Sequence, residues 1–161
     1  MDRDAETATD IDPAVVATLV AERSCERLMY TYAQLVDFGG AAGIADLFTT
    51  DGVWLGADGG AMRGQAAIRE AFSRRQGLTR RQSRHVITNV LVDVRSPDEA
   101  EGIAYLINYR HDSQSGVAEH PAPADAPKFV GEYHLSFRKD AAGWRIATLR
   151  FDLAFLRSRR T

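Results

Sequence analysis

The sequence predicts a single α+β domain in which helices come first and a curved antiparallel sheet follows. Three observations predict this fold class. The chain of 161 residues has the length of one ordinary domain with its own hydrophobic core. Apolar residues recur at helical spacing before residue 37, and long runs of β-branched and alternating residues fill most of residues 84–155. Helices followed by consecutive strands are typical of α+β domains.

The first helix is expected to run from Pro13 to about Val36. Asp12 precedes it as an N-cap, and Pro13 occupies the first helical position, where its missing N–H costs nothing. Gly39 follows the last apolar turn and provides the left-handed conformation that closes many helices. Two shorter helices are predicted at residues 41–48 and 64–75.

Four long strands are expected in the second half of the chain, after a short strand at residues 53–55. Turn sequences such as Ser96-Pro97-Asp98 separate them. Residues 112–127 contain several prolines, so we expect a long irregular loop there, which is a candidate lid over a binding site. The long strands are expected at residues 84–94, 102–111, 129–138 and 144–155.

Composition and charge exclude several classes of protein. The formal net charge of -2 does not indicate a nucleic-acid or anionic-membrane partner. No apolar run approaches the ~20 residues that cross a bilayer, and the polar N-terminus lacks a secretory core, so a cytoplasmic protein is expected. The domain is expected at residues 12–157, between a flexible tail at residues 1–11 and a basic tail at residues 158–161.

Arginine residues gather in two places, and the strands are apolar on both faces. Arg74-Arg75 with Arg80-Arg81, and the tail at residues 157–160, are interpreted as solvated surface rather than as phosphate sites. A sheet that is apolar on both faces predicts that one face packs on another subunit, so we expect a homo-oligomer, either a dimer or a trimer.

Asp37 and His85 are the candidate catalytic pair. Asp37 lies at the end of the first helix, where a negative charge faces the negative end of the helix dipole and needs a compensating partner. His85 opens an apolar strand and is expected to share a face with Ile87, Asn89 and Leu91. An aspartate that fixes one imidazole nitrogen makes the other a better base near neutral pH. Sequence position alone also allows purely structural roles, as a turn aspartate and a hydrogen-bonded core histidine.

Other residues add a pocket tyrosine but no metal or phosphate motif. Tyr32 precedes Asp37 on the same helix, so its ring can line a pocket and its hydroxyl can donate to a substrate, or it can simply pack in the core. The four histidines show no compact metal-binding spacing, and there is no glycine-rich phosphate loop. We therefore expect a site that uses neither a metal nor a cofactor.

Several motifs occur in an order and spacing that resemble one superfamily. They are residues 32–37 at the helix end, residues 44–54, the helix start at residues 64–68, the strand that begins Arg84-His85, and residues 143–146. Together they are similar to the SnoaL-like branch of the NTF2-like superfamily, over nearly the whole folded chain. The resemblance implies a strongly curved antiparallel sheet wrapped around the N-terminal helices, with a cone-shaped cavity.

The sequence is most similar to a subgroup that includes scytalone dehydratase, a bile-acid dehydratase and a hexachlorocyclohexane dehydrochlorinase. This resemblance implies that His85 takes a proton while a hydroxyl or chloride leaves, that Asp37 orients it, and that Tyr32 belongs to the pocket. Gly56 stands near the catalytic aspartate of ketosteroid isomerase, which argues against that mechanism. The candidate substrate-binding residues are Asn108, His134 and Trp54.

The function implied is a cofactor-independent, dehydratase-like lyase. Its substrate would be a small hydrophobic molecule of polyketide, steroid or terpenoid type. An isomerase or cyclase that uses the same acid–base pair is an alternative. Since some members of the superfamily are not catalytic, a ligand-binding module or an accessory subunit of an oxygenase is a further alternative.

Overall fold

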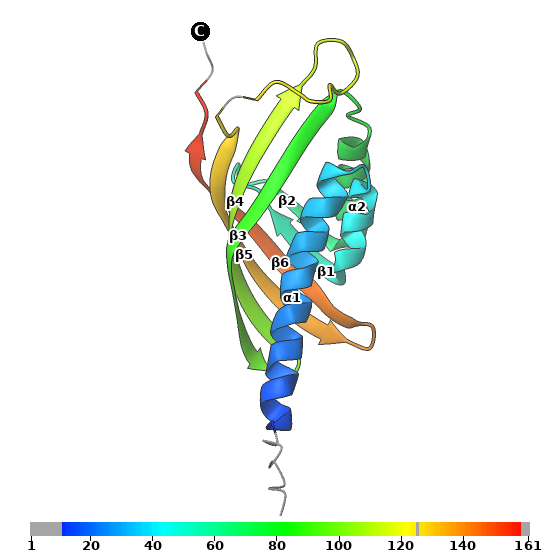
Figure 1. Cartoon of the computed structure of the whole chain (residues 1–161). Helices are drawn as coiled ribbons and strands as arrows, with labels where there is room; N and C mark the ends of the chain where they lie inside the picture. Colours follow the sequence, from blue (N-terminus) through cyan, green and yellow to red (C-terminus); the bar gives the residue numbers. More distant parts are fainter. Residues whose placement is uncertain (1–10, 125, 159–161) are drawn as a thin grey trace, which may run out of the picture.

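The computed structural model describes residues 11–124 and 126–158, which form one curved sheet packed against helices (Figure 1). The predicted N-terminal tail lies outside the described residues except for Ile11, and the predicted basic tail except for Ser158. In chain order the elements are α1 (Pro13–Asp37), the 3-10 helix η1 (Ala41–Leu47), β1 (Phe48–Leu55), β2 (Ala61–Arg63), α2 (Gly64–Gln76), β3 (Arg81–Ser96), β4 (Glu99–Asp112), β5 (Phe129–Asp140) and β6 (Gly143–Leu156).

The predicted α+β architecture is confirmed, with one difference in strand direction. The strands follow the order β2-β1-β6-β5-β4-β3, and β3 to β6 form an antiparallel meander. β1 pairs with β6 in parallel, so the sheet is mixed rather than wholly antiparallel. Strand direction alternates from β3 to β6, so the direction of β6 is fixed by the strands before it. The last strand of the meander then pairs with β1, which lies far away in the sequence. No local sequence pattern reports such a long-range pairing.

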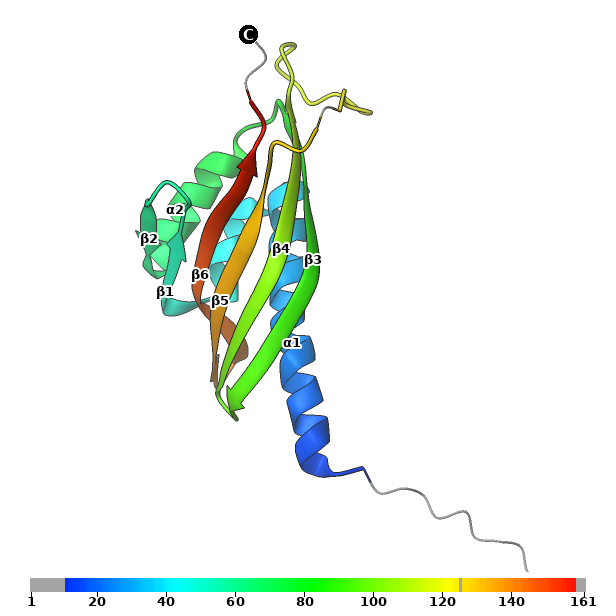
Figure 2. The same cartoon turned by 90° about the vertical axis from the view of Figure 1, so that its left-hand side faces the viewer.

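α1 follows the predicted boundaries closely. The Asp12 carboxylate accepts a hydrogen bond from the Ala14 backbone N–H at 2.8 Å, and Gly39 has a φ of 87° just after the helix. The first turns of α1 are exposed and extend beyond the sheet, whereas the later turns cross its inner face (Figure 2). None of the helices in the described part of the chain combines the length and apolar character needed to span a membrane.

A β-bulge in β3 reverses the faces of the strand. The register with β4 shifts between Thr88 and Leu91, and Asn89 takes a positive φ of 51°. Because a bulge inserts one residue, the alternation of side chains changes phase there. Ile87 and Val90 pack toward the core, whereas Leu91 is 71% exposed on the outer face. The prediction that Leu91 shares the face of His85 is therefore wrong, and the bulge also bends the strand around α1.

The outer face of the sheet carries exposed apolar side chains. They come from β3 and β4, namely Val86, Leu91, Tyr105 and Tyr109. Such a face is compatible with contact to another molecule, and the expected homo-oligomer stays a prediction.

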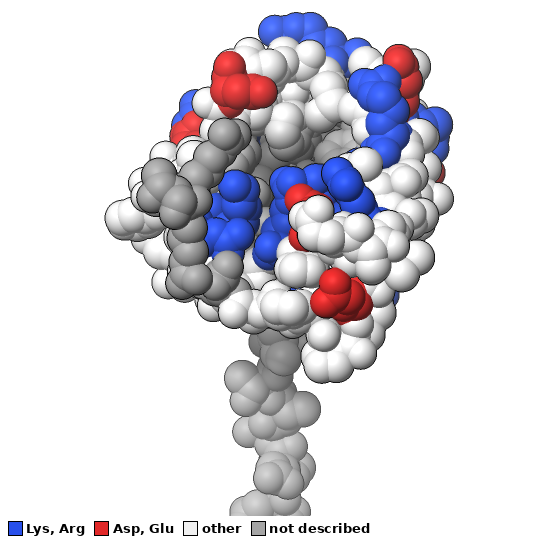
Figure 3. All heavy atoms as spheres, turned by 90° about the horizontal axis from the view of Figure 1, so that it is seen from above, with Lys and Arg blue, Asp and Glu red and all other residues white. Residues whose placement is uncertain are grey.

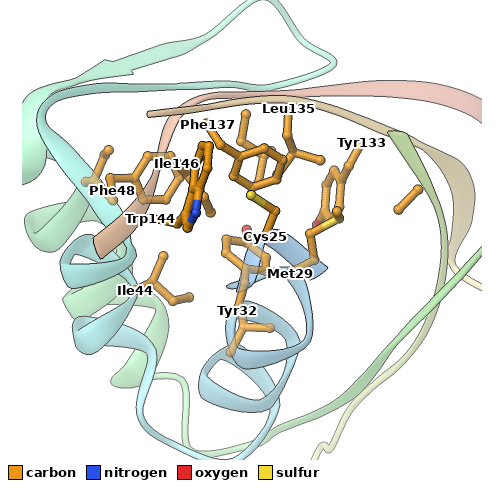
Figure 4. Close-up of a cluster of buried hydrophobic side chains, with 14 of the residues drawn as sticks. Cys25, Met29, Tyr32, Ile44, Phe48, Tyr133, Leu135, Phe137, Trp144 and Ile146 are labelled. Atoms are coloured by element: carbon orange, nitrogen blue, oxygen red, sulfur yellow. The ribbon is translucent and has the colours of Figure 1, made fainter. Parts of the chain in front are cut away.

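The hydrophobic core fills the space between α1, η1 and the sheet. Cys25 and Met29 of α1 lie among aromatic side chains of the strands, including Phe137 and Trp144 (Figure 4). Further along α1, Tyr32 and Val36 line a cavity instead. The packed core therefore occupies one end of the cone, and the C-terminal turns of α1 lie at the open end.

Phe48→Ala should be strongly destabilising. Phe48 is fully buried where η1 meets β1, so the truncation leaves a cavity that rigid neighbours cannot fill. We expect the free energy of unfolding to fall by about 3–5 kcal/mol, measured by urea denaturation. Val117→Ala, at an exposed loop position, should change it by less than about 0.5 kcal/mol. Equal effects of the two substitutions would contradict this assignment of the core.

Candidate functional site

Asp37 lies at the C-terminal end of α1 with its carboxylate turned toward the first residues of β3. Its side chain is only 4% exposed. Oδ1 accepts hydrogen bonds from the Ser83 hydroxyl at 2.9 Å and from His85 Nδ1 at 2.6 Å, and Oδ2 accepts the His85 backbone N–H at 2.6 Å. These donors supply the compensation that a buried negative charge at a helix C-terminus requires.

His85 is held by Asp37 at two points, through its ring and through its own backbone. The side chain is 12% exposed and lines the cavity. Because an ionised carboxylate can only accept, we infer that Nδ1 carries the ring proton. Among residues 11–124 and 126–158, no group hydrogen bonds to Nε2. That nitrogen is therefore the one available to a molecule in the cavity.

The cavity at this end of the cone has a volume of about 780 Å³. This volume lies within the range of pockets that bind small organic molecules. Seen from above, the molecule is hollowed, and Lys and Arg side chains gather around the hollow (Figure 3). Aromatic residues from both helices and several strands form much of the wall; they are Tyr32, Trp54, Phe72, Phe129, Tyr133 and Phe151.

Tyr32, Trp54 and Tyr133 form a linked aromatic group in this wall. Trp54 Nε1 donates to the Tyr32 hydroxyl at 3.2 Å, and the rings of Tyr32 and Tyr133 meet edge to face at 5.8 Å. Burial raises the pKa of Tyr32 to about 12, although its hydrogen bonds with Trp54 and Tyr133 act in the opposite direction. Burial also raises the pKa of Tyr133 well above its ordinary value. Both hydroxyls therefore stay protonated at neutral pH and can act as donors.

Asn108 lies beside His85 and has an unsatisfied polar atom. The two residues are partners in the β3–β4 register, and both line the cavity. Asn108 is 1% exposed, and its Oδ1 finds no hydrogen-bond partner within the described parts of the chain. Because an unpaired buried polar atom is costly, this amide is well suited to bind a polar group of a ligand.

His134 does not lie in this cavity. Side chains alternate along β5, so the inward position of Tyr133 places its neighbour His134 on the outer face of the sheet. There His134 Nε2 lies 3.3 Å from Asp152 Oδ2 and lines a separate groove. The structure thus gathers Asp37, His85, Tyr32, Trp54 and Asn108 around one cavity and leaves His134 outside it.

Sequence reasoning missed several polar residues of the site. Ser83 is two positions before His85 on the same strand face, so strand alternation could have identified it. Arg75 and Arg81 also line the cavity, which shows that the interpretation of these arginines as solvated surface is wrong. Arg75 is half-buried and donates to the Ser83 hydroxyl at 2.9 Å. No local signal separates Arg75 from its exposed neighbour Arg74, because the difference arises from how α2 packs.

Comparisons with known proteins agree with this architecture. The sequence matches the SnoaL-like domain family over residues 17–150, and no curated protein matches it. An NTF2-like protein with a cystatin-like fold from Novosphingobium aromaticivorans is 22% identical, with 87% of this chain and 86% of that chain covered and a TM-score of 0.73. A proposed scytalone dehydratase from the same species is 19% identical, with 91% of this chain and 93% of that chain covered and a TM-score of 0.75.

A hexachlorocyclohexane dehydrochlorinase is 13% identical, with 88% of this chain and 90% of that chain covered and a TM-score of 0.72. Identities this low establish a shared fold and do not by themselves transfer a reaction. The family match, in contrast, covers most of the sequence, including most of α1, the candidate pair and most of the sheet. The chain therefore belongs to the SnoaL-like domain family and has the NTF2-like fold.

Proposed function

We propose that this protein is a cofactor-independent lyase of the dehydratase type, acting on a small and largely apolar organic substrate. The observation that carries the proposal is the hydrogen bonding of the His85 imidazole and its place in the cavity wall. Its Nδ1 is bound to the buried Asp37 at 2.6 Å, its Nε2 has no partner in the described parts of the chain, and the side chain lines a cavity of about 780 Å³. An imidazole held in this way is oriented to exchange protons with a bound molecule.

The proposed reaction is a β-elimination of water. His85 Nε2 takes a proton from a carbon next to the one that carries a hydroxyl group. The electron pair of the C–H bond forms the double bond, the C–O bond breaks, and the hydroxyl leaves as water after it receives a proton from the imidazolium. Asp37 stabilises the imidazolium that exists between the two proton transfers.

Neutral donors in the wall would assist this reaction. The Tyr32 and Tyr133 hydroxyls stay protonated, and the Asn108 amide lies beside His85. Such groups can stabilise negative charge that develops on a substrate oxygen when the proton is removed. The aromatic walls would exclude water from the reacting carbon and hold the apolar body of the substrate.

The names of two structural neighbours support an elimination. A proposed scytalone dehydratase and a hexachlorocyclohexane dehydrochlorinase share the fold over most of their length. Both names denote reactions in which a small molecule is lost from a substrate. At these identities they give support to the reaction class, and they do not identify the substrate of this chain.

His85→Gln should abolish turnover while the protein stays folded. Glutamine cannot exchange protons as imidazole does, so the rate should fall by about 10³-fold. A panel of hydroxylated polyketide-, steroid- and terpenoid-like compounds would be screened by mass spectrometry for loss of one water. Products of unchanged mass would indicate an isomerase or cyclase instead. His134→Gln is the matched control, because that histidine also contacts an aspartate but lies on the outer face. Retained activity in His85→Gln would refute the proposal.

Asp37→Asn should lower kcat by about 100-fold or more. The amide can donate to Nδ1, which favours the tautomer with the proton on Nε2 and removes the base. Steady-state kinetics with the wild type as reference would measure this, and circular dichroism would establish folding. An unchanged kcat in a folded Asp37→Asn protein would show that the carboxylate has only a structural role.

Tyr32→Phe should lower kcat/KM by about tenfold, which corresponds to the loss of one hydrogen bond to a developing charge. The raised pKa also has a spectroscopic consequence. With a pKa of about 12, the Tyr32 hydroxyl stays neutral as pH rises and ionises only in strongly alkaline solution. Alkaline titrations of tyrosinate absorbance should therefore agree for wild type and Tyr32→Phe below about pH 11. A clear difference near pH 10 would contradict the role of Tyr32 as a neutral donor.

A further inference from the structure

Three arginine side chains line the cavity, although the chain as a whole is slightly acidic. Arg75, Arg81 and Arg110 line it together with Asp58, and the carboxylates of Asp37 and Asp112 are hydrogen bonded to lining residues. The formal net charge of the chain is -2, so this positive group is a local feature (Figure 3). An arginine that no carboxylate neutralises attracts a ligand of negative charge, and the low-dielectric walls of a cavity strengthen the effect.

Asp112 holds two of these arginines in place. Its Oδ1 accepts from Arg81 Nε at 2.6 Å, and its Oδ2 accepts from Arg110 Nε at 2.9 Å. Burial acts to raise the pKa of Asp112, but the hydrogen bonds from Arg81 and Arg110 hold it well below its ordinary value. Asp112 is therefore ionised at neutral pH. One carboxylate is thus shared by two guanidinium groups, which leaves this group of three with a net positive charge.

Arg75 has no carboxylate partner of its own. Within the described residues, its guanidinium makes one hydrogen bond, to the Ser83 hydroxyl at 2.9 Å, and no ion pair. Burial and the charges of Arg81 and Arg110 lower the pKa of Arg75, while Asp37 acts in the opposite direction. A half-buried cation with unused donors, directed into a cavity, is a binding site for an oxyanion.

The position of Arg75 relates this cation to the candidate catalytic pair. The Ser83 hydroxyl accepts from Arg75 and donates to Asp37, and Asp37 in turn holds His85. One serine side chain therefore separates the cation from the carboxylate that orients the imidazole. A ligand group bound by Arg75 would lie at the same end of the cavity as His85.

We propose that the ligand of this cavity is an organic acid whose carboxylate is bound by Arg75, with Arg81 and Arg110 adding long-range attraction. This inference rests on the proposed function in taking the cavity as the substrate site. A carboxylate needs only one guanidinium fork, and Asp112 already binds Arg81 and Arg110; this favours a carboxylate over a phosphate, whose higher charge calls for several unpaired cations. The aromatic walls would hold the apolar body of the acid beside His85 and Asn108.

The test compares naphthalene carboxylate with naphthalene carboxamide, a neutral molecule of nearly the same shape. Binding to the full chain would be followed by protein NMR, so that the signals of cavity residues report it. The carboxylate should bind wild type at least about tenfold more tightly than the carboxamide. Arg75→Gln should reduce this preference to about twofold or less and leave the carboxamide affinity nearly unchanged. Arg75→Lys, which keeps the charge, should retain part of the preference.

Arg74→Gln is the matched control, because Arg74 is the exposed neighbour that pairs with Glu70 on the solvent side of α2. It should keep the full preference for the carboxylate. The proposal is overturned if wild type binds both probes equally, if Arg75→Gln weakens both equally, or if Arg74→Gln has the same effect as Arg75→Gln. Tighter binding of naphthyl phosphate than of the carboxylate would also overturn the choice of an acid.

This experiment separates the inference from the proposed lyase activity, because it measures binding without turnover. His85→Gln should keep the preference for the carboxylate, since His85 does not contribute the charge. A preference for the acid with no lyase activity would support the inference and count against the proposed function. Dehydration of neutral substrates by a protein that shows no preference for acids would support the proposed function and count against the inference.

Discussion

The burial of one carboxylate at the end of a helix is the constraint on which the rest of this structure depends. The Asp37 side chain is almost fully buried, at the end of α1 where the helix dipole disfavours a negative charge. Its oxygens are satisfied only because Ser83 and the backbone and ring of His85 all donate to them. An unpaired buried charge is strongly unfavourable, so the helix end and the start of β3 must stay together. The interaction that joins these two elements also orients the imidazole.

The shape of the sheet follows from a second local feature, the bulge in β3. A regular strand of this length would be too straight to stay against α1 at both ends. The bulge at Asn89 bends the strand and changes which side chains face inward. Before the bulge, Ser83 and His85 face the cavity; after it, Val90 and Val92 face the core. One strand can therefore contribute polar residues to the site at one end and apolar residues to the packed core at the other.

The cavity joins an apolar wall to a small number of charged and polar groups. Aromatic rings provide most of the surface, and the hydroxyls among them are kept protonated by burial. The charged groups are concentrated near the end of α1, where the Ser83 hydroxyl lies between the Arg75 guanidinium and the Asp37 carboxylate. Because each of these groups is fixed by protein hydrogen bonds, little reorganisation is needed when a ligand binds.

The sequence by itself determined the helices, the four long strands and their order, because helical and strand periodicities are local properties that a core-forming chain must show. It missed the short strand β2 and the first half of β1, which are too short or too polar to give a periodic signal. It also identified Asp37, His85, Tyr32, Trp54 and Asn108 as candidates, in part through the resemblance to a known superfamily. Only the tertiary structure decided that Asp37 and His85 are in contact, that His134 faces outward, and that Arg75 enters the cavity while Arg74 stays in solvent. The parallel pairing of β1 with β6 was likewise decided there. These outcomes depend on contacts between residues far apart in the chain and on one inserted residue in a strand, and neither leaves a periodic signal in the sequence.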